Sequence, residues 1–135
     1  MRRYLRGFTL IELMIVIGII GLLAALIVPN FLRAKADTQF SSCEENCGNI
    51  AKALEMYAVD NSGHFPATMS ALTPNYLQVI PTCPAINADS YTASLSVASN
   101  PDSYTFFCSG NNHLIIGVPA NFPQYTSSQG LISGQ

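Results

Sequence analysis

Charged side chains are scarce in this chain, and positive ones beyond its first residues are scarcest. Aspartate, glutamate, lysine and arginine make up 10% of the 135 residues, and the formal net charge is −2. Beyond residue 7, three basic residues stand against eight acidic ones, which leaves that part at −5. Because nucleic-acid binding depends on clustered lysine and arginine, the sequence gives no support for a nucleic-acid partner.

The usual signatures of an enzyme or a metalloprotein are also missing. His64 and His113 read as loop histidines, and no Ser/His/Asp or Cys/His catalytic arrangement is visible. Cys43 and Cys47 have CxxxC spacing, but the other two cysteines stand alone and neither histidine has ligand-like spacing. We therefore expect no catalytic function, no cofactor and no bound metal.

One long apolar run dominates what is present. Residues 8–28, FTLIELMIVIGIIGLLAALIV, carry a single charge, at Glu12. A helix of that length spans roughly 30 Å, the thickness of the hydrocarbon core of a bilayer. A carboxylate in a membrane segment is by default functional, although Glu12 is near enough to one end to reach the interface. We favour the functional interpretation.

A short basic leader precedes this run. Residues 1–7, MRRYLRG, contain three arginines and no acid, so the positive-inside rule places them in the cytoplasm and the remainder across the membrane. A secretory signal peptide has its small-residue cleavage site after the apolar stretch, whereas here the small residue, Gly7, lies before it. This order predicts processing that retains the hydrophobic segment.

The pattern after Pro29 is that of an amphipathic helix. Apolar residues follow one another at spacings of four and three, and so form a single stripe: Cys43, Cys47, Ile50, Leu54 and Tyr57. Asp60-Asn-Ser-Gly63 is expected to end the helix, with Gly63 as a left-handed cap. Residues 8–59 thus predict one long helix, with a sheet packed on the stripe.

Three positions weaken this helix. Glycine costs about 1 kcal/mol relative to alanine in a helix interior, and proline costs about 3 kcal/mol. Gly18, Gly21 and Pro29 therefore mark a stretch that can bend or locally unwind.

The remaining residues predict a small antiparallel sheet. Thr68 is expected to cap a short helical turn that ends at Leu72, and residues 75–80 are expected to be extended. From residue 91 the apolar period changes to two, which predicts three strands joined by short turns, at Tyr91–Val97, Tyr104–Cys108 and Leu114–Val118.

The predicted fold class is α+β, with a long N-terminal helix whose first half is transmembrane and whose C-terminal half packs on a small antiparallel β-sheet. The expected divisions are a leader at 1–7, a transmembrane helix at 8–29 and a globular domain at 30–135. Within that domain we expect an amphipathic helix at 30–60, a loop at 61–90, a sheet at about 91–118 and an irregular tail at 119–135.

The four cysteines allow three pairings, and an exported domain favours at least one disulfide. A bond between Cys83 and Cys108 would close a loop of about 25 residues and contribute roughly 3 kcal/mol in the chain-entropy model. Cys43 and Cys47 share a helical face, where a bond would be strained, so two buried free thiols are the simpler interpretation. Cross-pairing between the two sets stays open.

Residues 7–13, GFTLIEL, followed by the apolar run and Pro29, resemble the type IV pilin and type II secretion pseudopilin superfamily. Residues 53–66 are more loosely similar to the helix end and following loop of pseudopilins. The resemblance implies that a prepilin peptidase cleaves between Gly7 and Phe8 and methylates the new amino group of Phe8. It also implies that Glu12 pairs with the terminal amine of a neighbouring subunit.

The resemblance further implies assembly with copies of itself and other pilins, driven by an assembly ATPase and an inner-membrane platform protein. The subunit would start as a single-pass protein of the bacterial inner membrane, with its C-terminal domain extracytoplasmic. It would end in a cell-surface pilus or a periplasmic pseudopilus, a choice that the sequence leaves open. No acidic loop resembles the calcium site of the major pseudopilins, because Asp89 and Asp102 are isolated. The alternative is a signal-anchored extracytoplasmic binding module that forms no filament.

Overall fold

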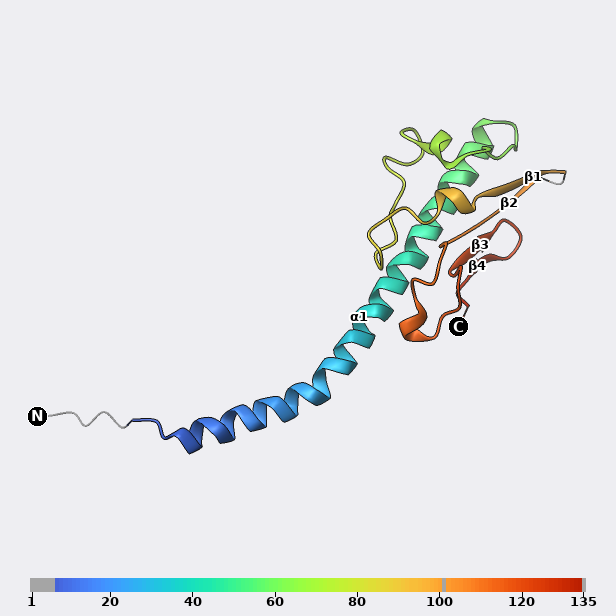
Figure 1. Cartoon of the computed structure of the whole chain (residues 1–135). Coiled ribbons are helices and arrows are strands. Elements are labelled where there is room, and N and C mark those ends of the chain that lie inside the picture. Colours follow the sequence, from blue (N-terminus) through green and yellow to red (C-terminus); the bar gives the residue numbers. More distant parts are fainter. Residues whose placement is uncertain (1–6, 101, 135) are drawn as a thin grey trace, which may run out of the picture. The chain divides into compact units, whose positions relative to one another are not determined.

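A computed structural model gives the fold of the chain and describes residues 7–100 and 102–134 (Figure 1). One helix, α1 (Leu10–Asp60), is followed by four strands and three short 3-10 helices among these residues. The predicted α+β class, a long N-terminal helix with a small antiparallel sheet, is confirmed. Contacts divide the chain into two units, Met1–Ala34 and Lys35–Gln135, and each is described by itself.

α1 ends where its sequence indicates. The N–H of Gly63 donates to the carbonyl of Ala58 at 2.8 Å, and both Ser62 and Gly63 have left-handed backbones, with φ of 60° and 89°. This bond and backbone are those of a Schellman motif, which satisfies carbonyls that the helix leaves without partners. The predicted left-handed backbone at Gly63 is confirmed.

The part of α1 that belongs to the second unit buries the predicted apolar stripe. Cys43, Cys47, Ile50 and Leu54 are fully buried, and Tyr57 packs at the edge of the same core. Each fully buried side chain of the size of Ile50 or Leu54 contributes about 1.5–3 kcal/mol. The other elements supply the rest of this core: Met69, Leu72, Cys83, Tyr91, Tyr104, Phe106 and Cys108.

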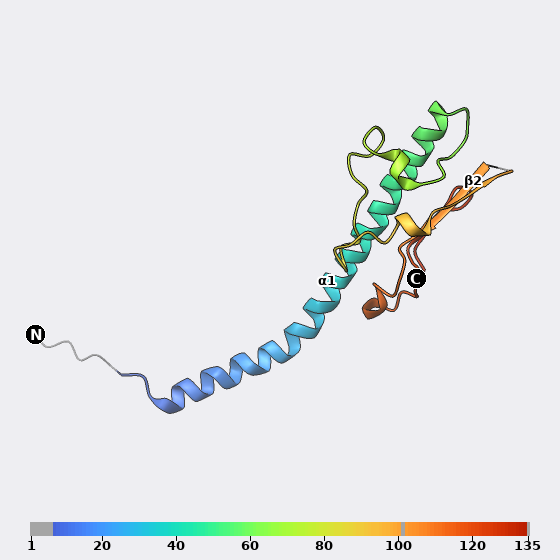
Figure 2. The same ribbon diagram turned by 45° about the horizontal axis from the view of Figure 1, so that its top comes forward.

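The sheet lies alongside the C-terminal part of α1 (Figure 2). Its strands are antiparallel neighbours in chain order: β1 (Ser96–Ser99), β2 (Asp102–Phe107), β3 (Gln124–Thr126) and β4 (Gly130–Ile132). Tyr104 and Phe106 of β2 point into the core, as the alternation predicts, and their rings stack with that of Tyr125 on β3. Tyr104 also donates its hydroxyl to Glu55 of α1 at 3.0 Å, so a polar contact fixes the sheet to the helix.

The first predicted strand begins later than expected. Residues Thr92–Ser94 form the 3-10 helix η2, and β1 starts only at Ser96. Asp89 explains the difference, because its carboxylate accepts the backbone N–H groups of Tyr91 and Thr92 at 2.9 and 3.1 Å. Such a local side-chain bond offers the backbone an alternative to a strand ladder.

The prediction of a third strand at Leu114–Val118 is wrong. Leu114–Ile116 forms the 3-10 helix η3, which ends at Gly117 with a left-handed φ of 83°. The tail after residue 119, predicted to be irregular, instead contains β3 and β4, so the predicted limit of the sheet at about 118 is also wrong. A short apolar run such as LII does not by itself distinguish a strand from a helical turn.

The connection between helix and sheet is mostly turns. Met69–Leu72 forms the 3-10 helix η1, and Met69 and Leu72 anchor it in the core. Thr68 holds the predicted cap position, but its side chain makes no capping hydrogen bond. The prediction of an extended stretch at residues 75–80 is wrong, because these residues form mainly turns and bends. The N–H groups of Tyr76 and Leu77 donate back to the carbonyl of Leu72.

Candidate functional site

The N-terminal part of α1 presents apolar side chains on every side. All residues from 7 to 35 are exposed. α1 includes a segment that is long and apolar enough to cross a membrane, judged by length and composition, and none of that segment is buried within the chain. A helix that is apolar all round needs an apolar environment. The exposed large side chains include Leu10, Ile11, Leu13, Ile15, Ile17, Ile20, Leu22, Leu26 and Phe31.

Glu12 lies in the first turn of this helix and makes a reciprocal cap with Thr9. Its Oε2 accepts the backbone N–H of Thr9 at 2.9 Å and the Thr9 hydroxyl at 2.7 Å. In return, the backbone N–H of Glu12 donates to the Thr9 hydroxyl oxygen at 3.3 Å. This is a capping box, in which a threonine and a glutamate three residues later satisfy each other's backbone donors. The spacing Thr-x-x-Glu in the sequence is the local signal for this cap, and the prediction from sequence did not include it.

The predicted cleavage point lies just before this cap. Residues 7–9 have no regular secondary structure, and Gly7 and Phe8 are exposed. Among the described residues, a Cβ added to Gly7 would meet no atom within 4 Å beyond its chain neighbours, so packing against them does not require glycine there. Residues 1–6 of the predicted leader lie outside the described residues. The roles of Gly7 and Phe8 stay predictions.

The helix runs without a break through the three positions expected to weaken it. α1 includes Gly18, Gly21 and Pro29, and the side-chain amide of Asn30 donates to the carbonyl of Leu26 at 3.3 Å beside the proline. No atom lies within 4 Å of a Cβ added to either glycine. Glycine at these positions is therefore not needed for packing within this chain, and bending there stays a prediction.

The two isolated acids of the C-terminal unit have protein partners. Asp89 accepts the backbone bonds that form η2. The carboxylate of Asp102 lies 2.8 Å from Nδ1 of the exposed His64. Both carboxylates thus serve contacts within the domain.

The cysteines are arranged differently from the sequence prediction. All four lie within the described residues and are free thiols, so the structure does not contain the expected Cys83–Cys108 disulfide. Instead, the sulfur atoms of Cys43, Cys83 and Cys108 and a ring nitrogen of His113 lie within 4.8 Å of one another. Cys47, one turn further along α1, is buried but outside this group.

His113 is the residue that the sequence analysis missed most clearly. It was interpreted as a loop histidine, but its side chain is 3% exposed and packs edge-on against the ring of Phe40, with centroids 5.0 Å apart. Its Nε2 lies 3.9 Å from the sulfur of Cys83 and 3.9 Å from that of Cys108. The available signal was the C-x₄-H spacing between Cys108 and His113.

Hydrogen bonds also set the electrostatics of this group. Bonds from Cys108 and Cys43 hold the pKa of the Cys83 thiol below its usual range, and the backbone N–H of Ala85 acts in the same direction. The same network, together with burial, raises the pKa of the Cys108 thiol.

Comparison with known proteins adds to this geometry. The family described as the prokaryotic N-terminal methylation motif matches residues 2–28. The type II secretion system core protein G of Escherichia coli K12 is 40% identical over 84 residues, which are 62% of this chain and 56% of that protein. The corresponding protein of Pseudomonas aeruginosa is 41% identical over 71 residues, 53% of this chain and 49% of its own length.

A pilus protein is also similar. The type IV wide pilus major component PilA4 of Thermus thermophilus is 42% identical over 62 residues, which are 46% of this chain and 47% of that protein. The chain spans about half the length of the curated relatives it matches. No solved structure matches it significantly. The N-terminal methylation motif and these relatives confirm the resemblance of the chain to the type IV pilin and type II secretion pseudopilin superfamily.

Proposed function

We propose that the chain is a structural subunit of a type IV pilus-like or type II secretion pseudopilus filament. The observation that carries the proposal is the exposure of every residue from 7 to 35, most of them apolar, in a stretch that largely coincides with the N-terminal methylation motif at residues 2–28. Exposed apolar side chains of this number need an apolar environment. A bilayer before assembly and neighbouring subunits afterwards would supply one.

Processing begins the proposed sequence of events. A prepilin peptidase cleaves between Gly7 and Phe8 and methylates the amino group of Phe8. Residues 8–29 then remain as the membrane segment, and the domain from residue 30 lies outside the cytoplasm. The absence of regular secondary structure at residues 7–9 supports this step, because a protease needs an accessible, non-helical segment.

Glu12 would act at the assembly step. In the single chain its carboxylate is engaged with Thr9, which lowers the cost of holding an acid near the membrane. In a filament the carboxylate pairs with the terminal amine of Phe8 on a neighbouring subunit. That pair sets the register between subunits, because exchanging lipid contacts for helix contacts gains little hydrophobic free energy.

Assembly in this scheme needs partners that supply energy. Extracting an apolar helix from lipid is the task of an assembly ATPase acting through an inner-membrane platform protein. Copies of this chain and other pilins complete the filament, which stands on the cell surface or in the periplasm. The relatives include proteins named for type II secretion and for a type IV pilus. The proposal therefore includes both a periplasmic pseudopilus and a cell-surface pilus.

The mass of the N-terminal peptide separates this proposal from a signal-anchored binding module. We expect the chain isolated from its own cells to begin at Phe8 and to carry a methylated amine. A signal anchor would keep residues 1–7. Recovery of the peptide that includes Met1 as the main species, from cells with an active prepilin peptidase, would contradict the proposal.

A further inference from the structure

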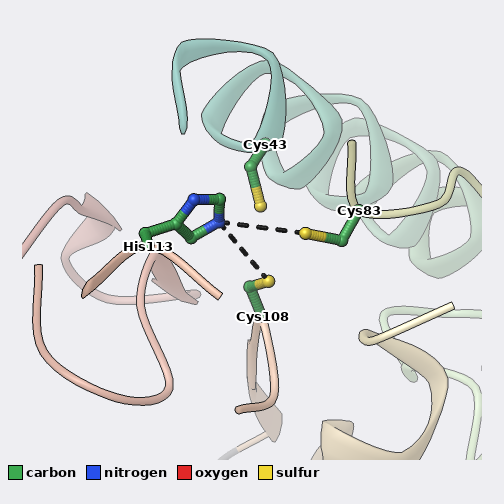
Figure 3. A group of neighbouring side chains, drawn as sticks. All are labelled: Cys43, Cys83, Cys108 and His113. Carbon is green, nitrogen blue, oxygen red and sulfur yellow. Dashed lines mark hydrogen bonds between the residues drawn. The ribbon is translucent and has the colours of Figure 1, made fainter. Parts of the chain in front are cut away.

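Four buried side chains from distant parts of the sequence converge on one point in the C-terminal unit. Cys43 lies on α1, and Cys83 lies in the turn closed by its bridge to Ala88. Cys108 directly follows β2, and His113 directly precedes η3. Figure 3 shows the three sulfur atoms and Nε2 of His113 directed toward one another. Each of the four side chains is at most 3% exposed.

The distances are close to those of a tetrahedral zinc site. Zn–S bonds of about 2.3 Å and Zn–N bonds of about 2.0 Å place neighbouring ligand atoms roughly 3.5–3.8 Å apart. Here Nε2 of His113 lies 3.9 Å from two sulfurs, and all four atoms lie within 4.8 Å of one another. A contraction of a few tenths of an ångström to about 1 Å would complete the coordination shell.

Disulfide formation explains the group less well. Three sulfurs meet here, so any disulfide between two of them leaves the third cysteine and His113 outside the bond. Cys47, which could complete a second pair with Cys43, lies one turn away on the same helix, where a bond is strained. A metal, in contrast, uses all four side chains at once.

Neighbouring polar groups are placed to support thiolate ligands. The Asn112 side-chain amide donates to the sulfur of Cys108 at 3.4 Å, and the Ser90 hydroxyl lies 3.2 Å from it. The Tyr91 hydroxyl lies 2.9 Å from the sulfur of Cys43. Hydrogen bonds of this kind orient metal ligands and are a normal part of such sites. Phe40 packs against the His113 ring and holds its orientation.

From this convergence, we propose that Cys43, Cys83, Cys108 and His113 bind one structural zinc ion. Sulfur and imidazole ligands in a tetrahedral set favour zinc, and four protein ligands with no open position indicate a structural site. Binding displaces the three thiol protons to solvent, leaves zinc in its divalent state and involves no electron transfer. The ion would join α1, β2 and two loops that contain little regular structure.

The test uses the full chain in detergent, purified anaerobically without chelator and supplied with zinc. We expect one zinc per chain by mass-spectrometric metal analysis and an intact mass with all cysteines reduced. Removal of the zinc by EDTA is expected to lower Tm by about 10 °C or more, because the binding free energy adds directly to folding free energy. Replacement of the zinc by Co²⁺ should give the visible spectrum of a tetrahedral, sulfur-rich site.

Matched variants locate the ion. Cys83→Ser is expected to lose stoichiometric zinc, whereas Cys47→Ser, on the buried face of α1 but outside the group, should keep it. If Cys83→Ser does not fold, the metal content and Co²⁺ spectrum of the unaltered chain still decide the question. Absence of zinc in that chain, a mass showing a disulfide within the group, or equal zinc in Cys83→Ser and the unaltered chain would each overturn the proposal.

Discussion

Replacement of Glu12 by alanine is expected to abolish filament assembly while leaving leader cleavage intact. The change removes the carboxylate that would neutralise the terminal amine of a neighbouring subunit. A charge left unpaired in a buried environment costs about 3–5 kcal/mol, which corresponds to a loss of roughly a hundredfold or more in the assembly equilibrium. The measurement is the yield of sheared filaments relative to processed subunit in the membrane.

The capping box provides a sharper control for this experiment. Glu12→Gln keeps a side chain that can accept the bonds from Thr9, because glutamine is also accepted at this position of a capping box, but it removes the charge. Glu12→Ala removes both the charge and the acceptor for the bonds from Thr9. Loss of a helix cap alone costs about 0.5–2 kcal/mol of helix stability. We expect both variants to fail in assembly. Normal filaments from Glu12→Gln would show that Glu12 acts through the helix cap and not through its charge. Normal filaments from Glu12→Ala would contradict any role of Glu12 in assembly.

Replacement of Gly7 by leucine is expected to leave an unprocessed precursor in the membrane. A Cβ at position 7 meets nothing within 4 Å in the part of the chain that the structure describes, so a side chain has room there. Any loss of cleavage must then come from the fit of the segment to the peptidase. The measurement is the size of the subunit on a denaturing gel, with the intact mass of the main band.

A matched change tests whether the effect is local. Gly21→Leu makes the same substitution within the apolar run at residues 8–28, also at a position where an added Cβ meets open space. It should be cleaved as the unaltered chain is, whatever it does to assembly. Full cleavage of Gly7→Leu, or equal failure of both variants, would count against Gly7 as the determinant of processing.

The helix could be predicted from sequence because its signals are local. The stripe through Cys43, Ile50 and Leu54 repeats at helical spacing, and Gly63 marks the left-handed end. Both signals lie within a few residues of the structure they specify. The Thr9–Glu12 cap is equally local, and only its identification as a capping box was missed.

The sheet and the cysteine group were harder because they depend on distant contacts. β3 pairs with β2 across a connection that contains η3, and residues 124–126 carry too short an alternation to indicate a strand. Similarly, Cys43 lies far from Cys83 and Cys108 in the chain, so no spacing rule connects it with His113. The disulfide expected between Cys83 and Cys108 rests on an exported domain and on loop length, and neither signal includes Cys43 or His113.

Electron microscopy of filaments labelled with antibody against this chain tests the central claim most directly. We predict gold label along the length of filaments from cells that carry the gene, whether these stand on the surface or are released from the periplasm. Cells lacking the gene should show no labelled filaments. Label confined to the cell membrane in gene-carrying cells, with filaments unlabelled or absent, would contradict the account.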